Sequence, residues 1–126
     1  MSESPLEPQV AVESRVTVVT LGPAFGTLDE HVLDTGLGDK LLKIAGAANP
    51  PLVVLDLSHT TFFGSSFIEV LFRLWHQIQT RPGGTFALCG LTEHCLEVLT
   101  VTHLDTLWRH FANRGEAVAG LSATAH

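Results

Sequence analysis

Positive charge is scarce in this chain. Its 126 residues include seven lysines and arginines against thirteen aspartates and glutamates, which gives a formal net charge of −6. Nucleic-acid affinity depends on neutralising phosphates with lysine and arginine, and the sequence has no basic stripe that would do so. Direct nucleic-acid binding is therefore not expected.

Long apolar runs are also missing. No uninterrupted stretch approaches the roughly 20 residues that a helix needs to cross a bilayer, so we expect no membrane insertion. Residues 1–9 are acidic, contain Pro5 and Pro8, and lack a cationic start followed by an apolar run, so we do not expect a signal peptide. We expect a cytoplasmic protein with a flexible tail at 1–9, one domain at 10–121 and a short tail at 122–126.

Cysteine is rare, and its spacing excludes two common roles. Five residues separate Cys89 from Cys95, which fits neither a Cys-x-x-Cys redox pair nor half of a zinc site. Each cysteine lies within an apolar pattern. We interpret both as reduced structural thiols.

The sequence also lacks recognisable catalytic machinery. His94, His103 and His110 do not have the spacing of a helical His-x-x-x-His face, so no metal site is predicted. Gly64-Ser65-Ser66 is not a Gly-x-Ser-x-Gly nucleophile motif, and the sequence contains no recognisable acid partner or oxyanion loop. We expect a protein that is not an enzyme and that binds no cofactor or metal.

The stretch from Leu52 to Leu71 is the most informative part of what is present. Residues 52–57 are short, nearly continuous in hydrophobicity and bounded by Pro50-Pro51 and Ser58, which predicts a central strand buried on both faces. From Ser66 to about Thr80 the period changes to that of an amphipathic helix. The predicted buried stripe of this helix is Phe67, Leu71, Leu74 and Ile78, widened by Ile68 and Trp75.

Two serines lie where this strand-to-helix connection ends. Ser65 or Ser66 is the expected N-cap of the helix, and capping alone is worth about 1 kcal/mol. The unpaired N–H groups and the dipole of a helix N-terminus also favour an anion, so a phosphate site is the functional alternative. The position of the serines favours the cap.

The remaining elements follow from turn and cap signals. Strands are predicted at 10–13 and 16–21, joined by a turn at Ser14-Arg15, and at 85–89 and 107–111. Thr27 and Glu30 form a capping box, which predicts a helix to near Gly46 with a stripe of Leu33, Leu37, Leu41 and Ile44. Thr92 is expected to cap a helix to about Thr100, and a last helix is expected at 114–121.

Strands that alternate with helices predict an α/β fold. We expect one domain with a mixed, mostly parallel sheet of about five strands and about four helices, the helices on one face of the sheet.

Three segments, taken in order, resemble the STAS domain, the anti-sigma-factor antagonist module. VLDLSHTTFFGSSFIEVL at 54–71 is similar to the family pattern DLS…FIDSSGLGVL. GGTFALCGL at 83–91 and LTVTHLDTLW at 99–108 are similar to the family's GGxLxLxxL and LxxTGLDxLF. The resemblance covers nearly the whole chain from about residue 10.

This resemblance implies a bacterial regulator of transcription that works by protein–protein contact. The expected partner is an anti-sigma factor or serine-kinase-like protein, and the resemblance leaves a homodimer open. Carried over by position, Ser65 is the phosphoacceptor, with Ser66 as the alternative, and phosphorylation switches the contact off. The expected partner-binding residues are Gly64, Ser65, Ser66, Phe67, Glu69 and Arg73.

The sequence departs from the family pattern at two of these positions. Gly64 replaces the usual acidic residue before the serines, and Phe67 replaces the glycine after them. Two alternatives therefore stay open: an unphosphorylated STAS-like subunit of a transporter or signalling assembly, and a module that senses a small ligand.

Overall fold

A five-stranded sheet forms the centre of the computed structural model, which describes residues 8–22, 25–29, 33 and 36–124. β1 runs antiparallel to β2, and every other neighbouring pair in this sheet is parallel. The strand order confirms the expected mixed, mostly parallel sheet. In spatial order the strands are β1 (Gln9–Glu13), β2 (Val16–Thr20), β4 (Leu52–Asp56), β6 (Thr85–Cys89) and β7 (Arg109–Phe111).

β4 is the central strand that the apolar run predicted. All five of its residues are buried. Val54 lies opposite Val18 of β2 on one side and Ala87 of β6 on the other. A strand that is paired on both edges and covered on both faces requires apolar side chains in both directions, which explains the nearly continuous hydrophobicity.

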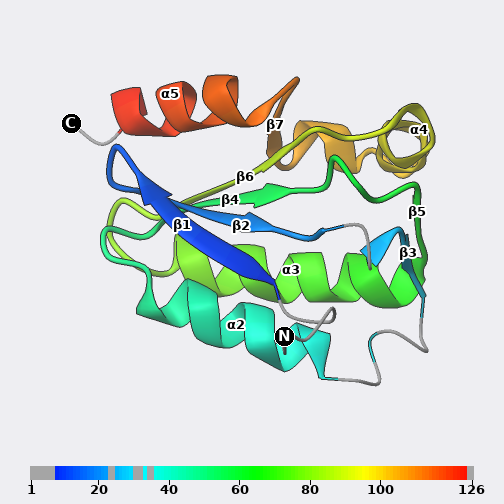
Figure 1. Ribbon diagram of the computed structural model, residues 1–126, viewed down its shortest axis with the longest axis horizontal. Coiled ribbons are helices and arrows are strands. Elements are labelled where there is room, and N and C mark those ends of the chain that lie inside the picture. Colours follow the sequence, from blue (N-terminus) through cyan, green and yellow to red (C-terminus); the bar gives the residue numbers. More distant parts are fainter. Residues whose placement is uncertain (1–7, 23–24, 30–32, 34–35, 125–126) are drawn as a thin grey trace, which may run out of the picture.

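Helices cover both faces of this sheet, so the expectation of a single helical face is wrong. Figure 1 shows α2 (Leu37–Ala47) and α3 (Ser65–Gln79) on one side and α5 (Arg114–Thr124) on the other. The physical reason is that alternate residues of the central strands are apolar on both faces. Beneath α5 the sheet buries Val16, Val18, Leu52, Val54, Ala87 and Cys89 against Ala117, Val118 and Leu121.

The helix after β4 has the predicted stripe, but not the predicted cap. Phe67, Leu71, Leu74 and Ile78 are all buried. α3 begins at Ser65, and its N-cap is Gly64, which offers no side-chain hydrogen bond. The expectation that a serine caps this helix is therefore wrong, because the extended segment ends at Gly64, so that Ser65 and Ser66 are the first two residues of the helix.

The α4 helix (Glu93–Val101) begins as predicted. The Thr92 hydroxyl oxygen accepts a hydrogen bond from the Cys95 backbone N–H at 3.4 Å. Cys95 and Leu99 of α4 are buried. A short 3₁₀ helix, η2 (Leu104–Thr106), follows and leads to β7.

The apparent capping box before α2 is a false signal. Thr27 and Leu28 form β3 (Thr27–Leu28), which pairs in parallel with β5 (Phe62–Phe63). Glu30 lies outside the described residues. α2 instead starts after Gly36, whose φ of 93° is in the left-handed region that glycine adopts at little cost.

The stripe predicted for this region is confirmed at two of its four positions. Leu37 and Leu41 are buried, Leu33 and Ile44 are half-buried, and Ala45 is the third buried residue of the helix. The small residues allow α2 and α3 to approach closely, since a Cβ added to Gly38 would lie 3.3 Å from a Val70 methyl group.

The first strand and the last helix are slightly longer than predicted. The predicted hairpin is present, and Ser14 and Arg15 both have positive φ, as a type I′ turn requires. β1 begins at Gln9 and α5 continues to Thr124. Residues 1–7 and 125–126 of the expected tails lie outside the described residues.

Candidate functional site

The two serines lie at one end of the molecule, where the parallel strands finish. The chain leaves β4, crosses residues 57–61, forms β5 and enters α3 through Gly64. Figure 1 shows the start of α3, β5 and α4 gathered at this end. Ligand and partner sites of parallel sheets commonly occupy this end, because the loops there follow the carboxyl ends of the strands.

The loop before the serines is fastened to two neighbouring segments through Thr60. This side chain is fully buried, and its hydroxyl donates to the Phe25 carbonyl oxygen at 2.9 Å. The Thr60 carbonyl oxygen accepts from the Thr92 hydroxyl at 3.2 Å and from the Cys95 thiol at 3.6 Å. Sequence reasoning missed Thr60, although a threonine directly after a turn is compatible with such a role.

The end of β4 carries a buried carboxylate. Asp56 is 8% exposed, and one of its carboxylate oxygens accepts from the Ser58 backbone N–H at 3.0 Å. Gly90 packs against this turn, and a Cβ there would lie 2.8 Å from that of Ser58. Burial raises the pKa of the neighbouring Cys89 thiol to about 12, and Asp56 adds to the rise through its charge and a hydrogen bond.

The serines differ in exposure. Ser65, the first residue of α3, is exposed, whereas Ser66 is half-buried. The first turn of α3 contains no acidic residue. The helix dipole at this end can therefore act on an added negative charge without competition from a carboxylate in the same turn.

Phe67 is not part of the exposed surface. Its side chain is fully buried and packs against Phe63, with 5.6 Å between the ring centroids. The expected direct contact between Phe67 and a partner is therefore wrong, because the aromatic ring fills the core beneath α3. We use the name docking surface for the remaining candidate residues: Gly64, Ser65, Ser66, Glu69 and Arg73.

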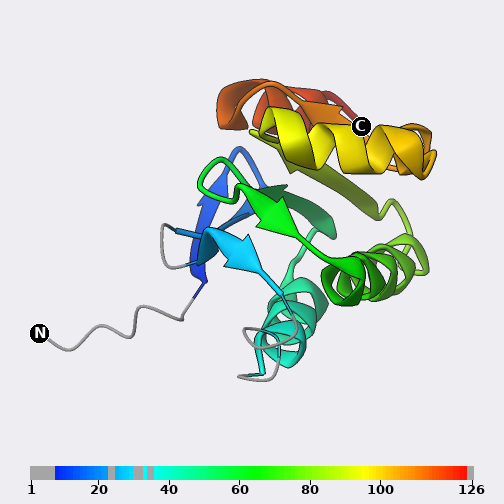
Figure 2. The ribbon, with the colours of Figure 1, turned by 90° about the vertical axis from the view of Figure 1, so that its right-hand side faces the viewer.

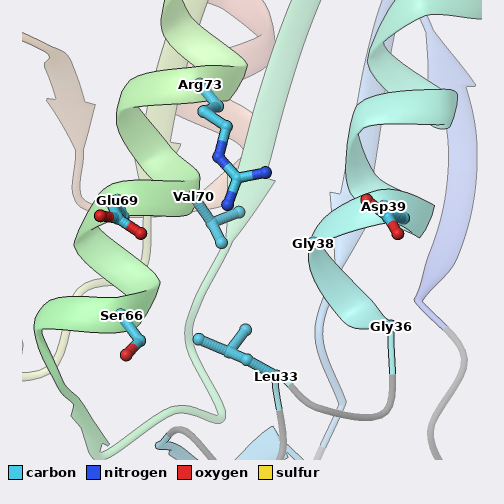
Figure 3. Close-up of a pocket in the computed structure, with 8 residues that line it drawn as sticks. All are labelled: Leu33, Gly36, Gly38, Asp39, Ser66, Glu69, Val70 and Arg73. Carbon is cyan, nitrogen blue, oxygen red and sulfur yellow. The ribbon is translucent and has the colours of Figure 1, made fainter.

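A groove of about 240 Å³ runs between α2 and α3, and three residues of the docking surface line it: Ser66, Glu69 and Arg73. Figure 3 shows Val70 and Leu33 at the groove from opposite sides, with the Arg73 side chain reaching into the space between the helices. Ser65 does not line the groove. The residues that line the groove are Leu33, Gly36, Gly38, Asp39, Ser66, Glu69, Val70 and Arg73.

The histidines and cysteines are distributed over several elements. His94 is on α4, His103 precedes η2 and His110 is on β7. Within the described ranges, no group of three or more His, Cys, Asp or Glu side chains could hold a metal ion. Cys89 and Cys95 are both buried and free, as the apolar pattern predicted.

Trp108 belongs to the core. It is buried against Phe86 and Phe72, with ring centroids 6.3 and 5.1 Å away. Trp75 is partly buried against the same core. In the part of the chain that the structure describes, no helix combines the length and the hydropathy needed to span a bilayer.

Known structures share this arrangement of sheet and helices. An anti-sigma-factor antagonist (STAS) domain protein from Planctomyces limnophilus is 36% identical, with a TM-score of 0.86 over 91% of this chain and 97% of that chain. An anti-sigma factor antagonist from Mycobacterium paratuberculosis is 21% identical, with a TM-score of 0.75 over 95% and 98%.

A third similar structure is that of a phosphorylated protein. The Bacillus cell fate determinant SpoIIAA in its phosphorylated form is 18% identical, with a TM-score of 0.62 over 91% of this chain and 99% of that chain. At 18% identity this likeness concerns the fold.

The family assignment follows from the sequence match together with the fold. No curated protein matches the sequence of this chain. The family model of the STAS domain matches residues 7–117, which includes β1 to β7 and the start of α5. The chain therefore belongs to the STAS domain family.

Proposed function

We propose that this protein is an anti-sigma-factor antagonist, a cytoplasmic regulator of transcription. In this proposal the docking surface binds an anti-sigma factor or serine-kinase-like protein, and phosphorylation of Ser65 switches the contact off. The relative from Planctomyces limnophilus, which is 36% identical, is described as an anti-sigma-factor antagonist. The similarity to SpoIIAA, which has been solved in phosphorylated and unphosphorylated forms, agrees with a switch of this kind.

One observation carries the proposal: Ser65 is an exposed hydroxyl at the first position of a helix whose preceding loop is held in place. A kinase needs such a hydroxyl to reach the γ-phosphate of its nucleotide. Ser66 is half-buried and turned to the groove between α2 and α3, so it is the poorer acceptor.

The same geometry explains how a phosphate would act. It adds about −1.5 to −2 charges at a helix N-terminus, where the dipole tolerates it, so the domain stays folded. On the kinase, however, the phosphoserine would occupy the place of the transferred phosphoryl group and would face the remaining nucleotide phosphates. Bulk and charge therefore oppose docking of the phosphorylated form.

The proposal is tested with the chain and a candidate kinase of the anti-sigma-factor class from the same genome. The two proteins are incubated with ATP, and the phosphorylated residue is located by mass spectrometry of wild type, Ser65→Ala and Ser66→Ala. We expect phosphate on wild type and Ser66→Ala and none on Ser65→Ala. Phosphate on Ser66 of the wild-type protein would contradict the residue assignment.

A scaffold without phosphorylation is the second candidate function. Gly64 favours it, because the acidic residue usual in the family at that position would add a charge and a hydrogen-bond acceptor beside the serine. A kinase that binds the chain but leaves it unmodified in the same assay would support this candidate.

A ligand-sensing module is less well supported. The groove next to Ser66, of about 240 Å³, is smaller than the roughly 300–1,000 Å³ of most small-molecule sites. A hollow of about 350 Å³ reaches that range, but residues 105–111, from η2 to β7, line it, and neither serine does.

A further inference from the structure

Two exposed side chains from different elements stack on each other near the start of α3. Phe62, on β5, is 42% exposed. Its ring lies 5.7 Å from the imidazole of His94 on α4, with 23° between the planes. Figure 2 shows β5 and α4 at the same end of the molecule. We call this pair the Phe62–His94 stack.

The backbone beneath the stack is held by hydrogen bonds on both sides. The N–H groups of Thr61 and Phe62 donate to the Gly26 carbonyl oxygen at 2.8 and 3.2 Å. On the other side, the Thr92 hydroxyl ties the first turn of α4 to the Thr60 carbonyl oxygen. The backbone that carries the two rings is thus held in place, so little conformational entropy is lost when a partner covers them.

The surface of α4 next to the stack is acidic. Glu93, His94 and Glu97 are exposed, and the helix contains no lysine or arginine. Glu97 lies three residues after His94, a spacing that places their side chains on the same face of a helix. This spacing puts a carboxylate on the same helix face as one of the two exposed rings, within a protein whose net charge is −6.

We propose that the Phe62–His94 stack is an anchor site for an arginine side chain of the protein partner, with Glu97 as its counter-charge. A guanidinium group is planar and weakly hydrated, so it stacks on aromatic rings and pairs with a carboxylate at the same time. The identity of the partner rests on the proposed function, but the chemistry of the site does not. The site extends the partner interface from the docking surface on α3 across to α4.

The site can be tested without any partner. The chain is titrated with acetyl-Gly-Arg-Gly-amide and, separately, with the same peptide carrying citrulline, which is planar but uncharged. We expect the arginine peptide to shift the NMR signals of the Phe62 and His94 rings with a millimolar dissociation constant, and the citrulline peptide to shift them at least several-fold less. Equal shifts with both peptides, or shifts located elsewhere, would overturn the proposal.

A second arm separates charge from stacking. Glu97→Gln should weaken arginine-peptide binding several-fold, while His94→Phe, which keeps a stacked ring, should retain it. Phe62→Ala should abolish the shifts at His94. Leu107→Ala is the matched control, because Leu107 is 39% exposed and apolar but follows η2 and so belongs to neither β5 nor α4. Loss of peptide binding in Leu107→Ala would contradict the assignment.

The partner arm uses the kinase or anti-sigma factor that binds the wild-type chain. Phe62→Ala should weaken that complex at least about tenfold, as truncation of a buried aromatic anchor does, while Leu107→Ala should stay within twofold. If the partner binds Phe62→Ala as tightly as wild type, the anchor site is wrong and the proposed function stands. If no such partner binds the wild type, the proposed function fails, and the peptide titration still decides the anchor site.

Discussion

At the scale of single residues, the two departures from the family pattern have different physical consequences. Phe67 fills a buried position against Phe63, so its large side chain contributes to the core and adds no area to the docking surface. Gly64 has extended backbone angles, φ −103° and ψ −173°, and a Cβ built there meets nothing within 4 Å. Its conformation therefore does not require glycine.

Gly64→Asp should consequently be tolerated and should stabilise the protein slightly. An aspartate at the N-cap can accept a hydrogen bond from the first turn of α3 and interact with the helix dipole. We expect the free energy of unfolding to rise by about 0.3–1 kcal/mol. Urea denaturation of the variant beside wild type measures the change, and a loss of 1 kcal/mol or more would contradict the extended, unhindered geometry at this position.

The buried thiol of Cys89 should make the stability of the protein depend on pH. Burial and the adjacent Asp56 raise its pKa from 9.0 to about 12. Below pH 9 the thiol is neutral in both states, so the stabilising contribution is fully present. Between pH 9 and 12 the unfolded chain loses this proton and the folded chain keeps it, so the free energy of unfolding falls.

Cys89→Ser, which does not titrate in this range, should lose less stability than wild type over the same interval. Thermal melts at several pH values from 8 to 11 measure the difference between the two slopes, and Cys95, present in both proteins, cancels from it. Identical slopes would show that Cys89 is not a buried, proton-retaining group.

At the scale of elements, hydrophobic periodicity predicted the helices and strands that are long and regular. β4, β6, α3 and α4 were found from apolar patterns and a threonine cap, because their burial repeats with the period of the element. β3 and β5 were missed, since a two-residue pairing has no period and its stability comes from contacts distant in sequence. The false capping box at Thr27 has the same origin: the local pattern was overridden by pairing with β5.

The candidate site was predictable in part for a related reason. The strand-to-helix pattern predicted where the serines lie. The exposure of Ser65 and the burial of Phe67 depend on the exact residue at which the helix begins, and a shift of one residue would change both. The stacking of Phe62 on His94 joins residues 32 positions apart, so no pattern in the local sequence predicts it.

The central position of β4 predicts the effect of a charge there. Val54 is fully buried between the sheet and α5. Val54→Asp would place an unpaired carboxylate in the core, which costs several kcal/mol and is comparable with the stability of a small domain. We expect an unfolded or insoluble protein by circular dichroism and gel filtration.

Val12→Asp is the control for that variant. Val12 lies on the edge strand β1 and is 68% exposed, so the same new charge should leave the protein folded. A soluble Val54→Asp protein that melts cooperatively would overturn the assignment of β4 as the central strand.

At the scale of the whole molecule, the proposed binding residues lie at one end of a sheet that helices cover on both faces. The elements that gather at this end are β3, β5, α4 and the start of α3 (Figure 1). These elements carry Phe62 in β5, Ser65 at the start of α3 and His94 in α4. The acidic balance of the chain favours a basic partner surface at that end. A regulator built in this way can change its binding through one residue without changing its fold.

Partner affinity of Ser65→Asp, measured together with its melting temperature, tests this account most directly. Ser14→Asp is the matched control, because it adds the same charge to an exposed serine in the β1–β2 turn, at the opposite ends of the parallel strands. We predict that Ser65→Asp melts within a few degrees of wild type and binds its partner at least about tenfold more weakly, or 1.4 kcal/mol, while Ser14→Asp binds normally. A Ser65→Asp protein that binds as tightly as wild type would contradict the switch.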